Sequence, residues 1–95
     1  MPTVRFPAAM KYYAENHSEI RVAASTVREA VEAVSERYPK LRVHVFDAEG
    51  KIRRHFNIFV NGEHVRELNG VDTVLNEEDK VILMATSAGG CAANI

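Results

Sequence analysis

The sequence holds a single cysteine, Cys91, and no tryptophan. One cysteine excludes an internal disulfide and any metal site built from several cysteines. No apolar run approaches the ~20 residues that cross a bilayer. The first residues, Met1-Pro2-Thr3-Val4-Arg5, lack the basic region and apolar stretch of a signal peptide. We therefore expect a cytoplasmic protein with no membrane partner.

Neither sign of charge is in excess, because twelve Lys and Arg face thirteen Asp and Glu for a formal net charge of -1. This balance predicts no affinity for nucleic acid or an anionic membrane. The densest basic cluster is Arg53-Arg54-His55. We interpret it as a solvated strand flank, with a partner contact as the alternative. The length of 95 residues fits one domain.

Side chains that could hold a metal or carry catalysis are not grouped in the sequence. The histidines are His17, His44, His55 and His64, and no pair has helical ligand spacing. The acidic candidates are Asp47, Glu49, Glu77, Glu78 and Asp79. They fall in predicted polar turns, which favours solvated surface over acid–base pairs. We expect no metal, no bound cofactor and no catalytic residue, so the protein is predicted not to be an enzyme.

One helix is strongly predicted. Thr26 and Glu29 form a capping box, in which each side chain bonds a free amide of the first turn. The apolar residues that follow at helical spacing are Val27, Ala30, Val31, Val34 and Tyr38. The opposite face carries Arg28, Glu32, Ser35 and Glu36. Pro39 has no N–H and is expected to stop the helix.

Alternating patterns predict strands over residues 3–6, 19–22, 55–60 and 80–86, with a short strand at Val65 and Leu68 at most. Asn61-Gly62 is a strong hairpin signal, and Glu49-Gly50 and Asn69-Gly70 predict further turns. Residues 8–13 fit a helical turn or a packed loop, and residues 41–46 are compatible with more than one state. A hairpin, one main helix and further strands imply an α+β fold. The first and last strands can pair in parallel at the sheet centre, which is the β-grasp arrangement.

We expect a β-grasp domain over residues 1–86 and a flexible tail over residues 87–95. Strand alternation turns Phe56, Ile58 and Val60 toward the helix and Phe59 away from it. The same alternation turns Ile82 and Met84 of the last strand away from the helix. Because one helix covers one face, Phe59, Ile82 and Met84 are predicted to form an exposed, partner-binding apolar patch. The alternative is that a loop covers this face.

The tail contains Ala88-Gly89-Gly90. From Thr86 to Gly90 it can extend about 17 Å from the sheet. Two glycines without side chains can pass through a channel too narrow for other residues. Taken alone, the pair also fits an end with no role. Cys91 has no basic neighbour that would activate it, so we expect an ordinary thiol. Its position, fifth from the end, does not match the prenylation motif.

The order of elements and the terminal Gly-Gly resemble the ubiquitin-like sulfur carriers: the thiamine thiazole carrier, the small subunit of molybdopterin synthase and the carrier of a cysteine pathway. The resemblance is strongest over residues 51–66, which include Phe-Asn-Ile-Phe-Val-Asn-Gly, then Leu68, Gly70 and Asp72, residues 79–83, and Ala88-Gly89-Gly90. Glu78 departs from a common glycine and Ala85 from a common proline. Cys91 to Ile95 follow the glycine at which an active carrier ends.

The resemblance implies that the Gly90 carboxylate is adenylated by a ubiquitin-activating-type enzyme with ATP, and that a sulfur donor then converts it to a thiocarboxylate. A synthase would accept the sulfur, for cysteine, another sulfur amino acid or a thio-metabolite. It also implies that a JAMM-type zinc metalloprotease cuts between Gly90 and Cys91 and removes Cys91 to Ile95. Two alternatives stay open: a ubiquitin-like modifier joined to lysines through Gly90, and a non-catalytic interaction module.

Overall fold

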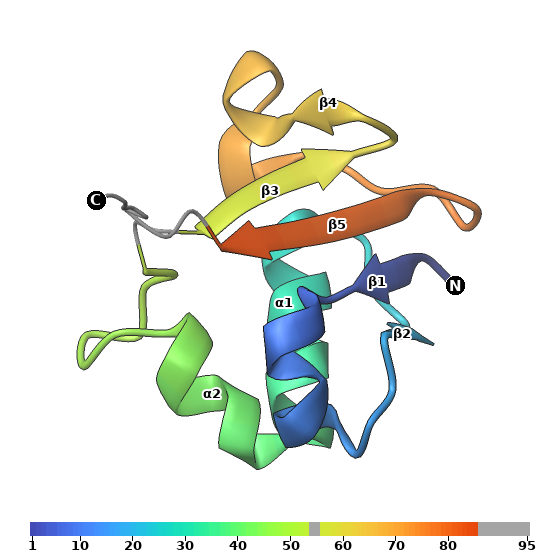
Figure 1. Ribbon diagram of the computed structural model, residues 1–95. Helices are drawn as coiled ribbons and strands as arrows, with labels where there is room; N and C mark the ends of the chain where they lie inside the picture. The colour runs from blue at the N-terminus through green and yellow to red at the C-terminus, as the bar shows by residue number, and fades with distance from the viewer. Residues whose placement is uncertain (54–55, 86–95) are drawn as a thin grey trace, which may run out of the picture.

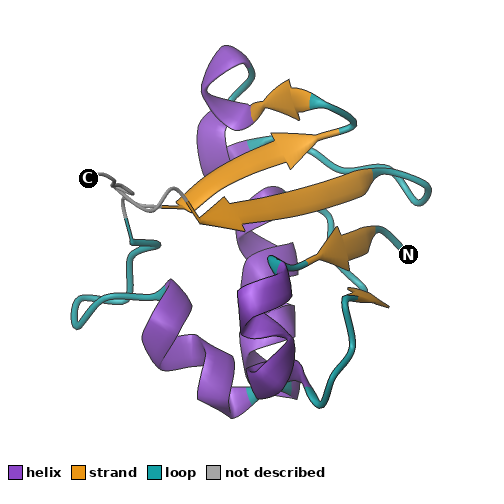
Figure 2. Cartoon of the chain, viewed as in Figure 1, coloured by secondary structure: helices purple, strands orange, loops and turns teal. Residues whose placement is uncertain are grey.

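The computed structural model describes residues 1–53 and 56–85, and its elements are labelled in Figure 1. Five strands form one sheet: β1 (Thr3–Arg5), β2 (Glu19–Arg21), β3 (Phe56–Val60), β4 (Glu63–His64) and β5 (Lys80–Ala85). The described residues also form two α-helices, α1 (Val27–Arg37) and α2 (Pro39–Val45). There are three 3₁₀ helices as well: η1 (Ala8–Ala14), η2 (Val65–Glu67) and η3 (Gly70–Asp72). The helices and strands are distinguished by colour in Figure 2.

The sheet has the order β2-β1-β5-β3-β4. The first and last strands pair in parallel, with Val4 opposite Val81, while every other pairing is antiparallel. This central parallel pair confirms the predicted α+β mixed sheet. The predicted strand at residues 55–60 is present as β3, apart from His55, which lies outside the described residues.

Helix α1 begins where the capping box predicts. The Glu29 N–H donates to Thr26 Oγ1 at 3.2 Å. The Glu29 carboxylate accepts from the backbone N–H of Ser25 at 2.8 Å, one residue earlier than the expected partner. All five residues predicted for the apolar face are buried: Val27, Ala30, Val31, Val34 and Tyr38.

Ser35 is a correction to the predicted helix faces. We placed it on the exposed side, but it is 1% exposed and its hydroxyl has no hydrogen-bond partner in the structure. The reason is the neighbouring helix α2, which packs against α1. One apolar stripe therefore underestimates the buried surface of a helix that contacts both a sheet and a second helix.

Pro39 ends one helix and begins another. Helix α1 stops at Arg37, Tyr38 adopts a non-helical conformation, and Pro39 occupies the first turn of α2. A proline fits there because the first N–H groups of a helix have no partner within the helix. The segment left open over residues 41–46 is thus mostly helical, and it buries Leu41 and Val45. Residues 8–13, also left open, lie within the 3₁₀ helix η1 (Ala8–Ala14).

The Asn61-Gly62 hairpin is confirmed. Both residues have positive φ, 52° and 90°, as a two-residue turn of this kind requires. The short strand β4 follows at Glu63–His64, so the strand predicted at Val65 and Leu68 is wrong in position. Val65 begins η2, and its side chain is buried in the core. An isolated apolar residue after a turn does not distinguish a strand from a 3₁₀ turn.

The core lies between the sheet and the helices. It joins Val4 of β1, Ile58 of β3 and Leu83 of β5 to the buried stripe of α1 and to Leu41 and Val45 of α2. One face of the sheet is therefore covered by helices (Figures 1 and 2). Within the described residues, no helix has the length and apolar character to cross a membrane.

Candidate functional site

The uncovered face of the sheet, called here the outer face, is organised in rows by strand register. One row crosses all five strands: Glu19, Arg5, Ile82, Phe59 and His64, each directly opposite the next. A second row holds Arg21, Thr3 and Lys80. A third pairs Met84 with Asn57. The face therefore has an apolar centre on β3 and β5, with charged side chains on β1 and β2.

The three residues predicted to bind partners, called here the outer patch, are Phe59, Ile82 and Met84. Phe59 and Ile82 are half-buried and face each other across β3 and β5, while Met84 is 51% exposed. None of them belongs to the core cluster or packs against it. No described loop covers Met84. An exposed apolar patch of this kind is typical of a binding surface.

His64 borders the outer patch in a defined orientation. Its Nδ1 accepts the Arg66 N–H at 3.0 Å, so in this network the proton resides on Nε2. The Nε2 atom then donates to Asn57 Oδ1 at 2.9 Å. The ring contacts Phe59 edge-on, with 5.1 Å between ring centroids. The imidazole thus bonds Asn57 and contacts Phe59 on the outer face.

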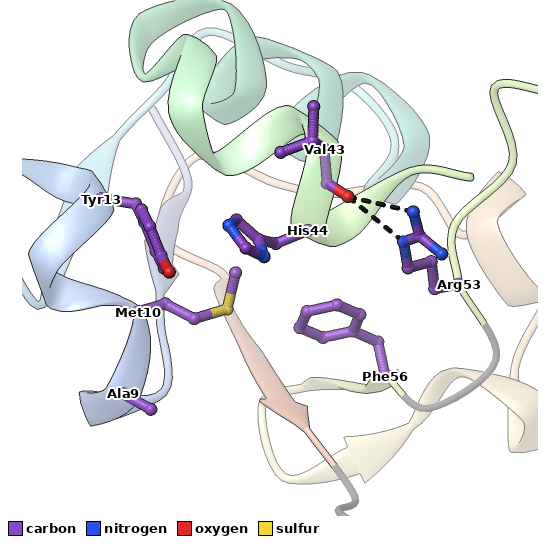
Figure 3. Close-up of a pocket in the computed structure, with 7 residues that line it drawn as sticks. All are labelled: Ala9, Met10, Tyr13, Val43, His44, Arg53 and Phe56. Carbon is purple, nitrogen blue, oxygen red and sulfur yellow. Dashed lines mark hydrogen bonds between the residues drawn. The ribbon is translucent and has the colours of Figure 1, made fainter. Parts of the chain in front are cut away.

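Strand β5 ends beside the outer patch, because Ala85 follows Met84. Ala85, the last described residue, lies opposite Phe56 at the end of β5 nearest α2 (Figure 1). On the helix side of this end lies a hollow of about 470 Å³ (Figure 3). Met10, Tyr13 and Phe56 line it, together with His44, whose ring stacks on Tyr13 at 4.2 Å between centroids. The predicted tail residues Ala88, Gly89, Gly90 and Cys91 lie outside the described residues.

Arg53 acts in part as a structural anchor. Its guanidinium donates to the Val43 carbonyl at 3.1 and 3.3 Å (Figure 3). Val43 lies in the last turn of α2, where carbonyls lack partners within the helix. The interpretation of a purely solvated flank is therefore incomplete for Arg53, although the residue is exposed. Arg54 and His55 lie outside the described residues.

Two of the acidic candidates organise turns. Asp47 accepts the backbone N–H groups of Glu49 and Lys51. These bonds lower the pKa of the Asp47 carboxyl below its ordinary value of 3.8, and the bond from Lys51 has the larger effect. Asp79 accepts the N–H of Asn76 at 2.8 Å and the side-chain amide of Asn61 at 2.9 Å. These two bonds lower the pKa of Asp79. Both carboxylates have structural partners, and neither forms a carboxylate pair.

The histidines of the described chain are separated and engaged with other groups. His17 bonds the Tyr38 hydroxyl at 2.9 Å, His44 stacks on Tyr13, and His64 bonds Asn57. Across residues 1–53 and 56–85, no three metal-ligating side chains come together. Apart from the outer patch, the side chains described above form hydrogen bonds and ring contacts within the fold.

A mixed five-stranded sheet, with parallel first and last strands and helices on one face, defines a β-grasp protein of the ubiquitin-like class. The chain belongs to the ThiS family, whose profile matches residues 4–90. A candidate sulfur carrier protein of Archaeoglobus fulgidus is 30% identical over 87 residues, 92% of this chain and 96% of that protein. The sulfur carrier protein CysO of Mycobacterium tuberculosis is 26% identical over 90 residues, 93% of this chain and 97% of that protein.

Solved structures have the same fold. A chain of the Amycolatopsis orientalis BexX/CysO complex is 24% identical and superposes with a TM-score of 0.83 over 95% of this chain and 100% of that one. Small archaeal modifier protein 1 of Haloferax volcanii, also 24% identical, gives 0.81 over 94% and 98%. The curated relatives are sulfur carriers, which supports a sulfur carrier role for this chain.

Sequence reasoning missed Arg5, Asn57 and His64 on the outer face. The alternation of Thr3-Val4-Arg5 already implies that Arg5 faces away from buried Val4. The Asn61-Gly62 turn could also have placed His64, because a two-residue hairpin pairs Val60 with Glu63 and Phe59 with His64.

Proposed function

We propose that the protein carries sulfur as a thiocarboxylate on Gly90 after a protease removes Cys91 to Ile95. The observation that carries the proposal is the Gly89-Gly90 pair placed shortly after the last strand of a ThiS-family domain. The family match also ends at Gly90, which leaves Cys91 to Ile95 beyond it. Gly90 lies within about 17 Å of the end of β5 when the chain is extended. The carrier itself would supply no base or metal.

The chemistry follows from the carboxylate. In the precursor, the Gly90 carbonyl belongs to a peptide bond, and a zinc-bound water of a JAMM-type protease would cleave it. A carboxylate oxygen of freed Gly90 then attacks the α-phosphorus of ATP, releasing pyrophosphate and forming an acyl adenylate. Sulfide attacks this carbonyl and displaces AMP, which leaves a thiocarboxylate. The sulfur of that soft nucleophile can attack an electrophilic carbon of the substrate held by a synthase, which joins carrier and substrate as a thioester. Hydrolysis of the thioester by water then leaves the sulfur on the product as a thiol and returns Gly90 as a carboxylate.

The outer patch fits the role of docking surface for these enzymes. Met84 immediately precedes Ala85, the last described residue, so a partner that covers the patch lies next to the start of the tail. Ala88 and Gly89 are small enough to enter a narrow channel toward the active site. The folded domain would therefore present its terminus to partners and leave the reaction to them.

Intact-mass analysis tests the proposal. The full chain is incubated with a JAMM-type protease and a ubiquitin-activating-type enzyme from the same genome, together with ATP and sulfide. We expect the loss of Cys91 to Ile95, followed by the exchange of one oxygen for sulfur. The proposal is wrong if the full-length chain acquires sulfur with Cys91 to Ile95 still attached. It is equally wrong if sulfur is still acquired when both glycines are replaced by valine.

Cys91→Ser provides a matched control. Since Cys91 lies on the leaving side of the cut bond, its replacement should leave processing and sulfur loading unchanged. If Cys91→Ser abolishes loading, the thiol and not the Gly90 carboxylate carries the sulfur.

The second candidate is a ubiquitin-like modifier, favoured by the likeness in fold to the small archaeal modifier. An acyl adenylate at Gly90 would then react with a lysine amine and form an amide. A label selective for thiocarboxylates marks the carrier alone. Conjugates that resist reductant identify the modifier.

A further inference from the structure

The apolar outer patch is bordered on one side by cations. Arg5 on β1 is the direct neighbour of Ile82, and Lys80 lies two residues before Ile82 on the same face of β5. Arg21 lies beyond Thr3 in the row of Lys80. These three side chains are exposed, and Glu19 is the one acidic residue in the same two rows. The flank therefore has three positive charges against one negative charge, in a chain whose formal net charge is -1.

Within the described residues, these cations form no ion pair. The ion pairs of the described residues join Met1 to Glu77 and Arg28 to Asp72. Arg5, Arg21 and Lys80 take part in neither, and Arg5 makes no ion pair with Glu19 despite their direct opposition in the sheet. Unpaired cations next to an apolar contact surface favour a partner with opposite charge at the matching position.

We propose that the adenylating enzyme that docks on the outer patch places an acidic border against Arg5, Arg21 and Lys80. This inference rests on the proposed function and adds the chemistry and orientation of the partner surface. The partner would bury an apolar centre over Phe59, Ile82 and Met84 and set its carboxylates over β1 and β2. Because the cations lie on one flank only, the charges define how the partner is rotated on the sheet.

The orientation has a consequence for the tail. The Arg5–Ile82–Phe59 row runs across the strands, whereas β5 runs along its own axis to its end at Ala85. A partner held by its acidic border over β1 and β2 therefore has one defined direction in which its active site meets the chain beyond Ala85. Apolar contact alone does not fix the orientation of a partner, because the hydrophobic effect is non-directional.

Charge reversals test the inference. The full chain is titrated against the ubiquitin-activating-type enzyme from the same genome, at low salt and at 1 M NaCl. We expect Arg5→Glu and Lys80→Glu each to weaken binding about 3- to 10-fold at low salt, mainly through slower association. The difference should largely disappear at 1 M NaCl, where the Debye length is about 3 Å.

Two further variants test the direction and the location of the charge effect on binding. Glu19→Lys should tighten binding, since it removes the acid of the cationic flank and adds a positive charge. Lys40→Glu, on exposed α2 away from the sheet, changes the net charge as Arg5→Glu does and should leave binding nearly unchanged. The inference is overturned if Arg5→Glu and Lys80→Glu bind like Lys40→Glu, or if Glu19→Lys weakens binding.

Failure of the inference is distinguishable from failure of the proposed function. If the charge variants are neutral while Gly90 is still loaded with sulfur, the acidic border is wrong and the carrier role stands. If the wild-type chain is never loaded by protease, enzyme, ATP and sulfide, the carrier role itself is wrong.

Discussion

Phe59 on β3 lies directly across from Ile82 on β5, on the face of the sheet that the helices leave uncovered. The neighbours of both residues along the strands, Ile58, Val60, Val81 and Leu83, are all buried in the core. Two adjacent strands thus carry apolar side chains on both faces. The fold accounts for one face, and the other is the face on which we propose that a partner docks.

Alanine at Ile82 and Met84 separates binding from folding. Because Met84 is 51% exposed and Ile82 half-buried, each change should lower the free energy of unfolding by about 1 kcal/mol or less. Each should weaken binding of the adenylating enzyme about fivefold or more. Leu83→Ala is the matched control on the same strand: Leu83 is 2% exposed, so about 2–5 kcal/mol should be lost. Urea unfolding and calorimetric titration measure the two effects. Stability losses at Ile82 and Met84 as large as at Leu83 would show that the patch is core.

The start of α1 depends on one hydroxyl. Thr26→Ala removes the acceptor of the Glu29 N–H and should cost about 0.5–2 kcal/mol of unfolding free energy. Ser25→Ala is the adjacent control, since Ser25 bonds the Glu29 carboxylate through its backbone N–H. Its stability should match the wild type. Equal losses from the two variants in denaturant titrations would contradict the capping geometry.

Ser35 offers a route to a more stable protein. Its hydroxyl is buried without a partner, so Ser35→Ala should raise the unfolding free energy by about 1 kcal/mol. For a domain of this size the melting temperature would rise by about 4–8 °C. Ser35→Cys, which retains most of the volume without the strong polar group, should also be no less stable than the wild type. A lower melting temperature for both variants would mean that the hydroxyl is bonded in solution.

Asp79 should make stability depend on acid pH. Hydrogen bonds from Asn76 and Asn61 lower the pKa of its carboxyl in the folded protein. The unfolded state therefore binds the proton more readily. The stabilisation is complete above the ordinary, unfolded pKa of 3.8 and is lost as the pH falls through the lower folded pKa.

Comparison of Asp79→Asn with the wild type tests this sign. The difference in unfolding free energy should be constant near neutral pH and should shrink below about pH 4. A gap between wild type and Asp79→Asn that grows toward acid pH would contradict the assignment. Asp47, whose pKa is also lowered, contributes in the same direction.

Local sequence motifs were sufficient to locate an element where the residue types in the motif have a single physical explanation. Thr26 with Glu29 located the start of α1, and Asn61-Gly62 located the hairpin, because few residues tolerate two successive positive φ angles. The pattern over residues 41–46 did not decide between a strand and a helix, because Leu41 and Val45 are four apart and this spacing fits both. In the structure Val43, between them, is exposed. Only contact with α1 and η1 selects the helix there.

By itself, the sequence determined the order of the strands and helix α1, which apolar side chains face away from that helix, and a terminal Gly-Gly suited to a carrier. These features depend on neighbours along the chain, where spacing and backbone preference act. Only the tertiary structure decided the burial of Ser35, the anchoring of Arg53 on α2 and the row that places Arg5 beside Ile82 and Ile82 beside Phe59. These contacts join different elements of the fold, and helix packing and the order of the strands set them.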